Sequence, residues 1–311
     1  MSFKEQLKGR DLLTLADYSK AEIAYLLGLA TKIKKKRKNG EVYQPLKGKT
    51  LGMIFEKSST RTRVSFEAGI YQLGGTGLFL SSNDIQIGRG EPISDTAKVL
   101  SGYLDGIMIR TFSQKDVEDL AENATIPVIN GLTDDYHPCQ VLADLQTIKE
   151  KKGELEGLKL AYIGDGNNMA HSLMIGCAKM GIDVAIAAPD GYQPKGEITE
   201  HAKSFADGSE VLITDDPIEA VKNADVIYSD VWASMGQEQE QKLREKAFAM
   251  YQVNTELFSH AHDDAIFMHC LPAHRGEEVT TEIIDGPQSV VFEEAENRLH
   301  AQKALMVALM G

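Results

Sequence analysis

Cysteine is scarce in this sequence, and long apolar runs are absent. The three cysteines of the 311 residues, Cys139, Cys177 and Cys270, are an odd number without a paired spacing, so a disulfide framework is a poor interpretation. No stretch approaches the ~20 apolar residues that span a bilayer, and the first residues lack the apolar core of a signal peptide. We therefore expect a cytoplasmic protein that is neither secreted nor inserted in a membrane.

Positive charge is also in short supply. The sequence has 33 Lys and Arg against 46 Asp and Glu, a net charge of −13, which makes nucleic acids and anionic membranes poor partners. It does not exclude a small anionic substrate, because a few local arginines suffice to bind one. The hydrophobic content of 42% is typical of a globular protein, and the length is about twice the ~150 residues of a typical domain. Together they predict two ordinary globular domains.

Apolar strands alternate with helical stretches along most of the chain. The first helix is expected over 20–38, with Ser19 and Glu22 as a capping box and Gly40 at its end. The first series of strands is expected at 50–55, 77–81, 106–110 and 126–130, and the second at 159–163, 183–187, 211–214, 226–228 and 265–269. A polar segment, 151–157, separates the two series. The fold class is therefore predicted to be α/β, with two doubly wound parallel-sheet domains that helices link.

A cluster of donor side chains follows the first predicted strand. Ser59, Thr60, Arg61 and Thr62 lie where a helix is expected to begin. Hydroxyls, a guanidinium and the free N–H groups of a helix N-terminus together suit a phosphate-like dianion. The alternative is an ordinary Ser/Thr cap beside surface arginines. The density of donors favours the anion site.

Other motifs favour neither a nucleotide nor a metal. The Gly-Asp-Gly-Asn-Asn turn at 164–168 has Met169 in place of the third glycine of a dinucleotide fingerprint, and no Walker lysine loop is present. The basic run at 32–38 is interpreted as a solvated helix end. A metal site built from His137 and Cys139, completed by the histidines and cysteine at 269, 270 and 274, is the less favoured alternative, because usual zinc spacings are not met.

His137 and Cys270 each need an interpretation of their own. His137 precedes Pro138 at the expected start of a helix, where the macrodipole disfavours imidazolium, so we expect a neutral donor. Cys270 is either inert packing or a functional thiol. A Cys270 nucleophile with His269 as its base is conceivable, but adjacent side chains on a strand point to opposite faces.

Four motifs occur in a characteristic order. They are Ser-Thr-Arg-Thr-Arg at 59–63, His-Pro-Cys-Gln at 137–140, Asp-Val-Trp-Ala-Ser-Met-Gly at 230–236 and His-Cys-Leu-Pro at 269–272. Together they resemble the signature set of the ornithine carbamoyltransferases, across essentially the whole chain. The resemblance implies transfer of the carbamoyl group of carbamoyl phosphate to the δ-amine of L-ornithine, with no cofactor and no metal. It implies a carbamoyl phosphate domain at 1–150, on which the C-terminal helix 294–311 packs back, and an L-ornithine domain at 151–293.

The resemblance also implies the roles of individual residues. Three are expected to be catalytic, namely Arg110, His137 and Cys270. Carbamoyl phosphate is expected to contact Ser59, Thr60, Arg61, Thr62, Gln86, Arg110, His137, Pro138, Cys139, Gln140, Cys270, Leu271 and Arg298. Ornithine is expected to contact Asn168, Asp230, Ser234 and Met235, with Asp230 receiving the α-ammonium. Gln86 resembles a position that reaches a neighbouring subunit, which implies a homotrimer or a multiple of trimers.

Amine activation is the energetic problem on the ornithine side. An alkylammonium with a pKa of ~10.4 must lose a proton, which costs ~4 kcal/mol at pH 7. Other acceptors within the class are aspartate, putrescine and an acetylated ornithine, and the Ser-Met-Gly and His-Cys-Leu-Pro motifs favour free ornithine. From other classes, a dinucleotide-dependent dehydrogenase and a non-catalytic binding subunit that retains the fold stay open.

Overall fold

The computed structural model describes residues 2–85, 87, 90–234 and 238–311. The chain divides into two compact units, which are described separately. Unit 1 comprises Met1–Gln146 and Glu296–Gly311, and unit 2 comprises Thr147–Ala295. Both divisions fall inside helices, α6 (Pro138–Lys152) and α13 (Val291–Met310), so continuous helices link the units. In the described part of the chain, no helix is both long and apolar enough to cross a membrane.

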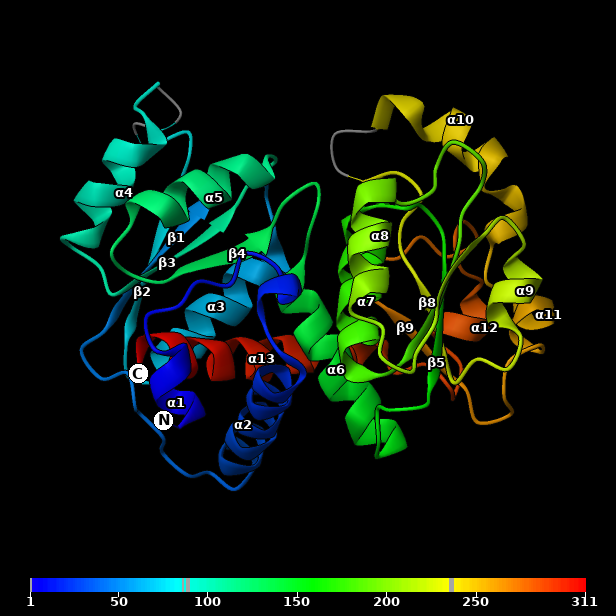
Figure 1. Ribbon diagram of the computed structural model, residues 1–311, viewed down its shortest axis with the longest axis horizontal. Helices are drawn as coiled ribbons and strands as arrows, with labels where there is room; N and C mark the ends of the chain where they lie inside the picture. The colour runs from blue at the N-terminus through cyan, green and yellow to red at the C-terminus, as the bar shows by residue number, and fades with distance from the viewer. Residues whose placement is uncertain (1, 86, 88–89, 235–237) are drawn as a thin grey trace. The chain divides into compact units, whose positions relative to one another are not determined.

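Unit 1 contains a parallel four-stranded sheet with the order β2-β1-β3-β4. Its strands are β1 (Thr50–Phe55), β2 (Thr76–Ser81), β3 (Gly106–Arg110) and β4 (Val128–Leu132). Its other helices are α1 (Phe3–Leu7), η1 (Leu15–Asp17), α2 (Lys20–Lys38), α3 (Thr60–Gln72), α4 (Ile93–Ser101) and α5 (Gln114–Asn123). In Figure 1, α4 and α5 lie on one face of this sheet, and α3 and α13 lie on the other.

Unit 2 contains a parallel five-stranded sheet with the order β7-β6-β5-β8-β9. Its strands are β5 (Lys159–Ile163), β6 (Asp183–Ala187), β7 (Val211–Thr214), β8 (Val226–Ser229) and β9 (Ile266–His269). Its helices are α7 (Asn168–Met180), α8 (Gly196–Ser204), α9 (Pro217–Val221), η3 (Glu238–Glu240), α10 (Gln241–Ala247), η4 (Ala249–Tyr251), α11 (Thr255–Phe258) and α12 (Thr281–Ile284). Helices α7 and α8 lie on one face, and α9, α11 and α12 lie on the other (Figure 1).

Both apolar cores follow from the strand sequences. In unit 1, Ile54, Ile107 and Ile109 project from the strands and pack with Val117 and Leu120 of α5. In unit 2, strand residues such as Ile163 and Phe267 pack with the helices on the face of α9. Strands that are buried on both faces read as continuous apolar runs, so the prediction of two doubly wound parallel sheets is confirmed.

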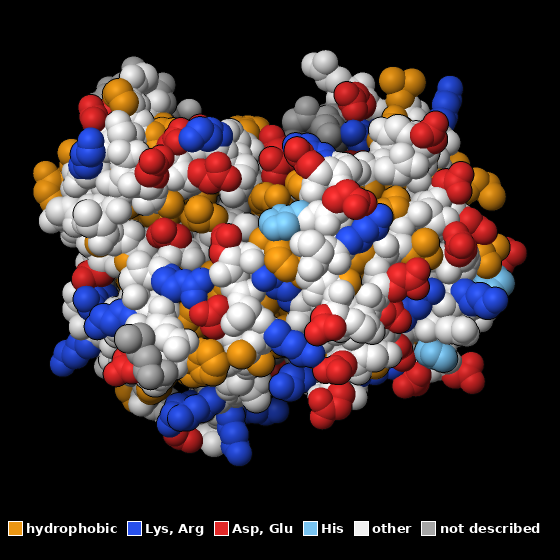
Figure 2. Space-filling model, viewed as in Figure 1, with side chains coloured by type: hydrophobic (Ala, Val, Ile, Leu, Met, Phe, Trp, Pro, Cys, Tyr) orange, Lys and Arg blue, Asp and Glu red, His pale blue; other side chains and the backbone are white. Residues whose placement is uncertain are grey.

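The basic end of α2 is ordinary helix chemistry. The helix spans Lys20–Lys38 as expected, and the Ser19–Glu22 capping box is present. Its last turn carries four cations, and Figure 2 shows blue side chains gathered where α2 ends. Lys36 pairs with Glu41 at 2.7 Å, and Arg37 donates to Gln72 at 2.8 Å. These cations complement the negative end of the helix macrodipole.

Candidate active site

The order of the strands predicts where ligands bind. In an open parallel sheet, ligands bind beyond the carboxyl ends of the strands, where the strand order reverses. This point lies between β1 and β3 in unit 1 and between β5 and β8 in unit 2. The register pairs Phe55 with Arg110, so the loop after β1 begins beside the Arg110 side chain.

Ser59 and the loop before it organise the start of α3. Ser59 caps the helix, and its hydroxyl accepts the Thr62 N–H at 3.1 Å. Thr60 is exposed and Arg61 is half-buried in the first turn, while Thr62 is buried. The buried Lys57 forms an ion pair with Asp134 and lies 4.4 Å above the Phe112 ring, which ties this loop to the loops after β3 and β4.

Arg298 joins three helices of unit 1. From α13, its guanidinium donates to Gln140 Oε1 of α6 at 2.6 Å and to Thr62 Oγ1 of α3 at 3.2 Å. The Gln140 amide in turn donates to Asp144 Oδ1 at 2.9 Å. Because Arg298 is 3% exposed, these contacts hold a cation inside unit 1 beside two residues of the predicted phosphate site.

His137 is buried among cations. Burial is the main cause that holds its pKa well below the usual range, and the neighbouring Arg298, Arg110 and Arg61 act in the same direction. The expected neutral state thus has a stronger cause than the helix dipole. A neutral imidazole surrounded by three guanidiniums can donate or accept a hydrogen bond without adding charge.

Pro138 and Cys139 are the first two residues of α6. Pro138 is the first helical residue, where its missing N–H costs nothing. The Cys139 thiol is fully buried and donates to the Asn130 carbonyl at 3.4 Å, and burial raises its pKa to about 12. A contact between Cys139 and a ligand would therefore come from its backbone.

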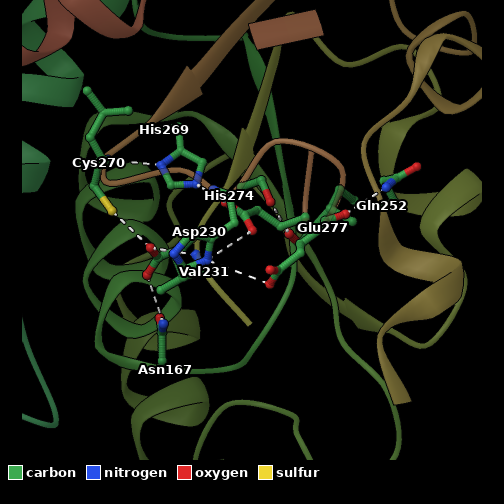
Figure 3. Close-up of polar contacts among 12 residues, drawn as sticks. Asn167, Asp230, Val231, Gln252, His269, Cys270, His274 and Glu277 are labelled. Carbon is green, nitrogen blue, oxygen red and sulfur yellow. Dashed lines mark hydrogen bonds and ion pairs between the residues drawn. The ribbon is translucent and has the colours of Figure 1, made fainter. Parts of the chain in front are cut away.

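In unit 2, Asp230 is the centre of a hydrogen-bond network. Its Oδ1 accepts the Val231 N–H at 2.8 Å and the Cys270 thiol at 3.1 Å, and its Oδ2 accepts the Asn167 amide at 2.9 Å (Figure 3). Asp230 follows β8 and Cys270 follows β9, so the sheet itself brings them together. The predicted residues Asp230 and Cys270 are adjacent in space although 40 positions apart in the sequence.

The sequence analysis named Asn168 but not its neighbour Asn167. Asn167 caps α7, accepting from Met169 N at 2.9 Å, while its amide nitrogen reaches Asp230. The expected Asn168 is the half-buried first residue of α7. The signal for Asn167 was available, because an Asn directly before a helix is a preferred cap.

An ion pair that the sequence did not predict connects α10 with the loops after β5 and β8. Arg244 of α10 binds Asp165 Oδ2 at 2.8 Å and the Trp232 carbonyl at 2.9 Å. Burial raises the pKa of Asp165 to about 6, although Arg244 opposes the shift. Burial is the main cause that raises the pKa of Tyr162, and Asp230, Asp165 and Cys270 act in the same direction.

Ser234, Met235 and Gln86 complete the predicted set. Ser234 is half-buried in the loop after Asp230. Met235 and Gln86 lie outside the described residues.

His269 and Cys270 point to different partners. The His269 ring bonds Glu278 at 3.1 Å, whereas the Cys270 thiol bonds Asp230, as expected for neighbours at the end of a strand. Leu271 follows them, half-buried, with a φ of 57°. His269 is therefore not aligned as the base of a Cys270 nucleophile.

Among the residues that the structure describes, two groups of side chains have a spacing that a metal ion could use. The donor atoms of Asp230, His269 and Cys270 lie within 4.8 Å of one another, and so do those of His274, Glu277 and Glu278. In the first group both nitrogens of His269 are already hydrogen-bonded within the protein. A metal would have to displace one of these bonds.

Two family models match successive parts of the chain. Residues 10–150 match the carbamoyl-P binding domain of the aspartate/ornithine carbamoyltransferases, and residues 156–309 match their Asp/Orn binding domain. The chain belongs to this family.

Individual relatives are also similar. An ornithine carbamoyltransferase of Oceanobacillus iheyensis is 70% identical over 99% of this chain and 96% of its own length. One of Bacillus subtilis is 65% identical over 98% of this chain and 95% of its own length. The structure of the Pyrococcus furiosus ornithine carbamoyltransferase superposes with a TM-score of 0.96 at 56% identity, covering 98% of both chains.

Proposed function

We propose that this protein transfers the carbamoyl group of carbamoyl phosphate to the δ-amine of L-ornithine, releasing L-citrulline and phosphate. The observation that carries the proposal is the environment of His137, which is buried and within electrostatic range of Arg61, Arg110 and Arg298. Such a group of fixed cations around a neutral donor suits a phosphate dianion and the oxyanion that forms when an amine attacks a carbonyl.

Unit 1 is the proposed carbamoyl phosphate domain. The Ser59–Thr62 turn and Arg61 would hold the phosphate, and Arg110 and His137 the carbamoyl oxygen. Gln140, positioned by Arg298, would orient the carbamoyl NH2. Because hydrogen bonds within unit 1 hold Ser59, Thr62 and Gln140, little reorganisation of these groups is needed when negative charge develops.

Unit 2 is the proposed L-ornithine domain. Asp230 is a buried acceptor suited to the α-ammonium, and Asn167 and Cys270 orient its two oxygens. Asn168, Ser234 and Met235 are proposed as further contacts with the amino acid. Cys270 and Leu271 would meet the δ-amine, which attacks directly, so no covalent enzyme intermediate is required.

The alternatives are less well supported. A dehydrogenase needs a close backbone approach to a pyrophosphate, yet Met169 occupies the third glycine position and Asn167 caps α7 with its own side chain. Asp230 would repel an aspartate and would lack an α-ammonium partner in putrescine. A non-catalytic subunit would not need two buried arginines, Arg110 and Arg298, beside the half-buried Arg61.

We further propose a cytoplasmic homotrimer, or a multiple of trimers, that serves arginine biosynthesis or the reverse reaction in arginine catabolism. Support for an oligomer comes from the edge strand β2 and the adjacent α3, where apolar side chains are exposed. They are Val64 at 57%, Tyr71 at 78%, Leu78 at 44% and Phe79 at 39%. Light scattering during gel filtration measures the oligomeric state, and a monomer would contradict this part.

The decisive experiment is a citrulline assay with carbamoyl phosphate and ornithine, run on the wild type and on Arg61→Ala. We expect citrulline from the wild type and a loss of about 10²–10³-fold in the variant. The matched control is Arg63→Ala, because Arg63 stacks on Phe79 at 3.7 Å and pairs with Glu67 at the surface. Rates with aspartate, putrescine and acetylated ornithine test the acceptor. A wild type that forms no citrulline refutes the proposal.

A further inference from the structure

A fully buried histidine–carboxylate pair lies beside the Cys270 turn without contributing to the proposed substrate contacts. His269 Nε2 is 3.1 Å from Glu278 Oε1, and both side chains have an exposed fraction of 0%. Burying two such groups costs free energy unless they hydrogen-bond each other. The pair also adjoins the candidate site, because His269 directly precedes Cys270. The pair therefore calls for a function other than general stability.

The other nitrogen of His269 determines where its proton lies. His269 Nδ1 is 2.9 Å from the backbone nitrogen of Leu271, which can only donate. Nδ1 must therefore accept, so the proton is on Nε2 and is donated to Glu278. In this tautomer the imidazole links the Leu271 backbone to a buried carboxylate, and its two nitrogens are both occupied.

Leu271 is a residue whose conformation needs such support. Its φ of 57° lies in the left-handed region, which is unfavourable for a residue with a bulky side chain. The hydrogen bond from its N–H to His269 is made in that conformation. The same bond orients the chain directly after Cys270, whose thiol bonds Asp230 on the other side.

Glu278 holds the far end of the same segment. Its Oε1 also accepts the His274 N–H at 2.6 Å, so one carboxylate oxygen binds both His269 and the backbone five residues later. Among the described residues, its Oε2 is buried without a hydrogen-bond partner, 4.0 Å from His274 Nδ1. Glu278 thus joins the two ends of the turn from 269 to 274, which contains Cys270 and Leu271.

We propose that His269 and Glu278 are positioning residues, which hold the Cys270–Leu271 turn where the δ-amine meets the carbamoyl carbon, and that His269 is not a base. This inference rests on the proposed function, since it assigns the turn to that reaction. Displacing reacting groups by about 1 Å can cost ~10²-fold in rate, so the effect belongs in kcat. Asp230 still holds the other end of ornithine, so KM for ornithine changes less.

Two substitutions of His269 separate the roles of its nitrogens. His269→Asn keeps an acceptor at the Nδ1 position, and we expect kcat within about threefold of the wild type. His269→Gln reaches toward Glu278 but leaves the Leu271 N–H without its acceptor, and we expect kcat to fall about 10–10²-fold with KM for ornithine within about threefold. Both variants should show the wild-type pH profile, apart from the reduced rate.

Glu278 has its own conservative pair. Glu278→Gln keeps an oxygen that accepts from His269 and His274, and its NH2 group takes the place of Oε2, so we expect near-normal kcat. Glu278→Ala removes the support and should lower kcat as His269→Gln does. If His269 acted as a base assisted by Glu278, Glu278→Gln and His269→Asn would each lose ~10²-fold or more, together with a limb of the pH profile.

Nitrogen-15 NMR of histidine-labelled wild type keeps the proposal testable if a variant fails to fold. We expect a His269 signal with the proton on Nε2 and an unprotonated Nδ1 that accepts a hydrogen bond. A proton on Nδ1, equal losses in His269→Asn and His269→Gln, or unchanged kcat in both His269→Gln and Glu278→Ala would each overturn it. Absence of citrulline from the wild type would refute the proposed function, whereas the tautomer is measured without any substrate.

Discussion

The two units carry opposite charges at the same topological position. Unit 1 places Arg110 at the end of β3 and Arg61 in the helix turn after β1, whereas unit 2 places Asp165 and Asp230 just after β5 and β8. Both sheets are parallel and doubly wound, so the architecture is not the source of the difference. A sheet determines where a ligand binds, and the loop residues determine which ligand it is.

The contrast is visible in the buried neutral groups of each unit. In unit 1 arginines help to lower the pKa of His137, and in unit 2 aspartates help to raise the pKa of Tyr162. Burial is the largest cause in both cases and disfavours the charged form of each group. Each unit therefore keeps a neutral side chain beside charges of one sign.

The largest expected effect comes from removing a cation of unit 1. Arg110→Gln should lower kcat/KM by about 10²–10³-fold, because a fixed donor aimed at developing charge is lost. The same variant should raise the pKa of His137, since Arg110 is one of the cations that lower it. Steady-state rates and histidine NMR measure the two effects. The exposed Arg275→Gln, which loses a surface pair with Asp285, is the control. An unaltered affinity for carbamoyl phosphate together with an unaltered pKa of His137 would contradict the cationic role given to unit 1.

Removing an anion of unit 2 should act on the other substrate. Asp230→Asn should raise KM for ornithine about 10–10²-fold, because a charged hydrogen bond contributes about 1.5–3 kcal/mol. Calorimetric affinity for carbamoyl phosphate should stay within about threefold. Asp190→Asn, in an exposed loop of the same unit, is the matched control. If both substrates were weakened equally, the two units would not have separate roles.

A third test concerns the energetic cost of the acids in unit 2. The folded pKa of Asp165, about 6, lies above its ordinary 3.8, so its contribution to stability is complete below 3.8 and is lost as the pH rises through 6. Between pH 5 and 8, the unfolding free energy of Asp165→Asn should therefore improve relative to the wild type by about 1 kcal/mol. Urea unfolding at several pH values measures the difference, and a pH-independent difference would contradict it.

The smallest effect concerns a cation of unit 1 away from the predicted site. Burial, with Arg37 beside it, lowers the pKa of Lys303 to about 8, and its ammonium donates to Gln72 at 3.0 Å. A lowered lysine pKa means that stability present above 10.5 is lost as the pH falls through 8. Lys303→Met should therefore stabilise the protein by about 1 kcal/mol at pH 7 and by less at pH 9.5. Thermal unfolding measures this, with the exposed Lys47→Met as control. Equal gains at both pH values would exclude the charge as the cause.

Local patterns predicted the regular elements well. Helix α2 begins at Lys20 because Ser19 and Glu22 satisfy its first N–H groups, and β3 and β5 have the expected ends because their apolar runs stop there. The short helices α10, α11 and α12 were not predicted, since four to seven residues show too little periodicity. Their positions depend on packing against the second sheet.

The residues of the candidate site also divide into those that the sequence identified and those that only the structure revealed. Arg110, Asp230 and Cys270 were named at expected strand ends and Arg61 at an expected helix start, and the structure has these elements there. Asn167 and Arg244 were not named, because their importance comes from partners far away in the sequence, and Glu278 was not named because only folding places it against His269. Arg244 reaches Asp165 across 79 positions, and Asn167 reaches Asp230 across 63. No local pattern encodes such pairs.

The sequence by itself determined the alternation of strands and helices, the start of α2, the ends of strands such as β3 and β5, and the four motifs that place the chain in its family. These are consequences of short-range properties such as backbone hydrogen bonding, side-chain periodicity and capping. Only the tertiary structure decided that His269 faces Glu278 while Cys270 faces Asp230, and that burial keeps His137 neutral. Hydrogen-bond partners and desolvation depend on which groups folding brings together, and this is a property of the packed chain rather than of any segment.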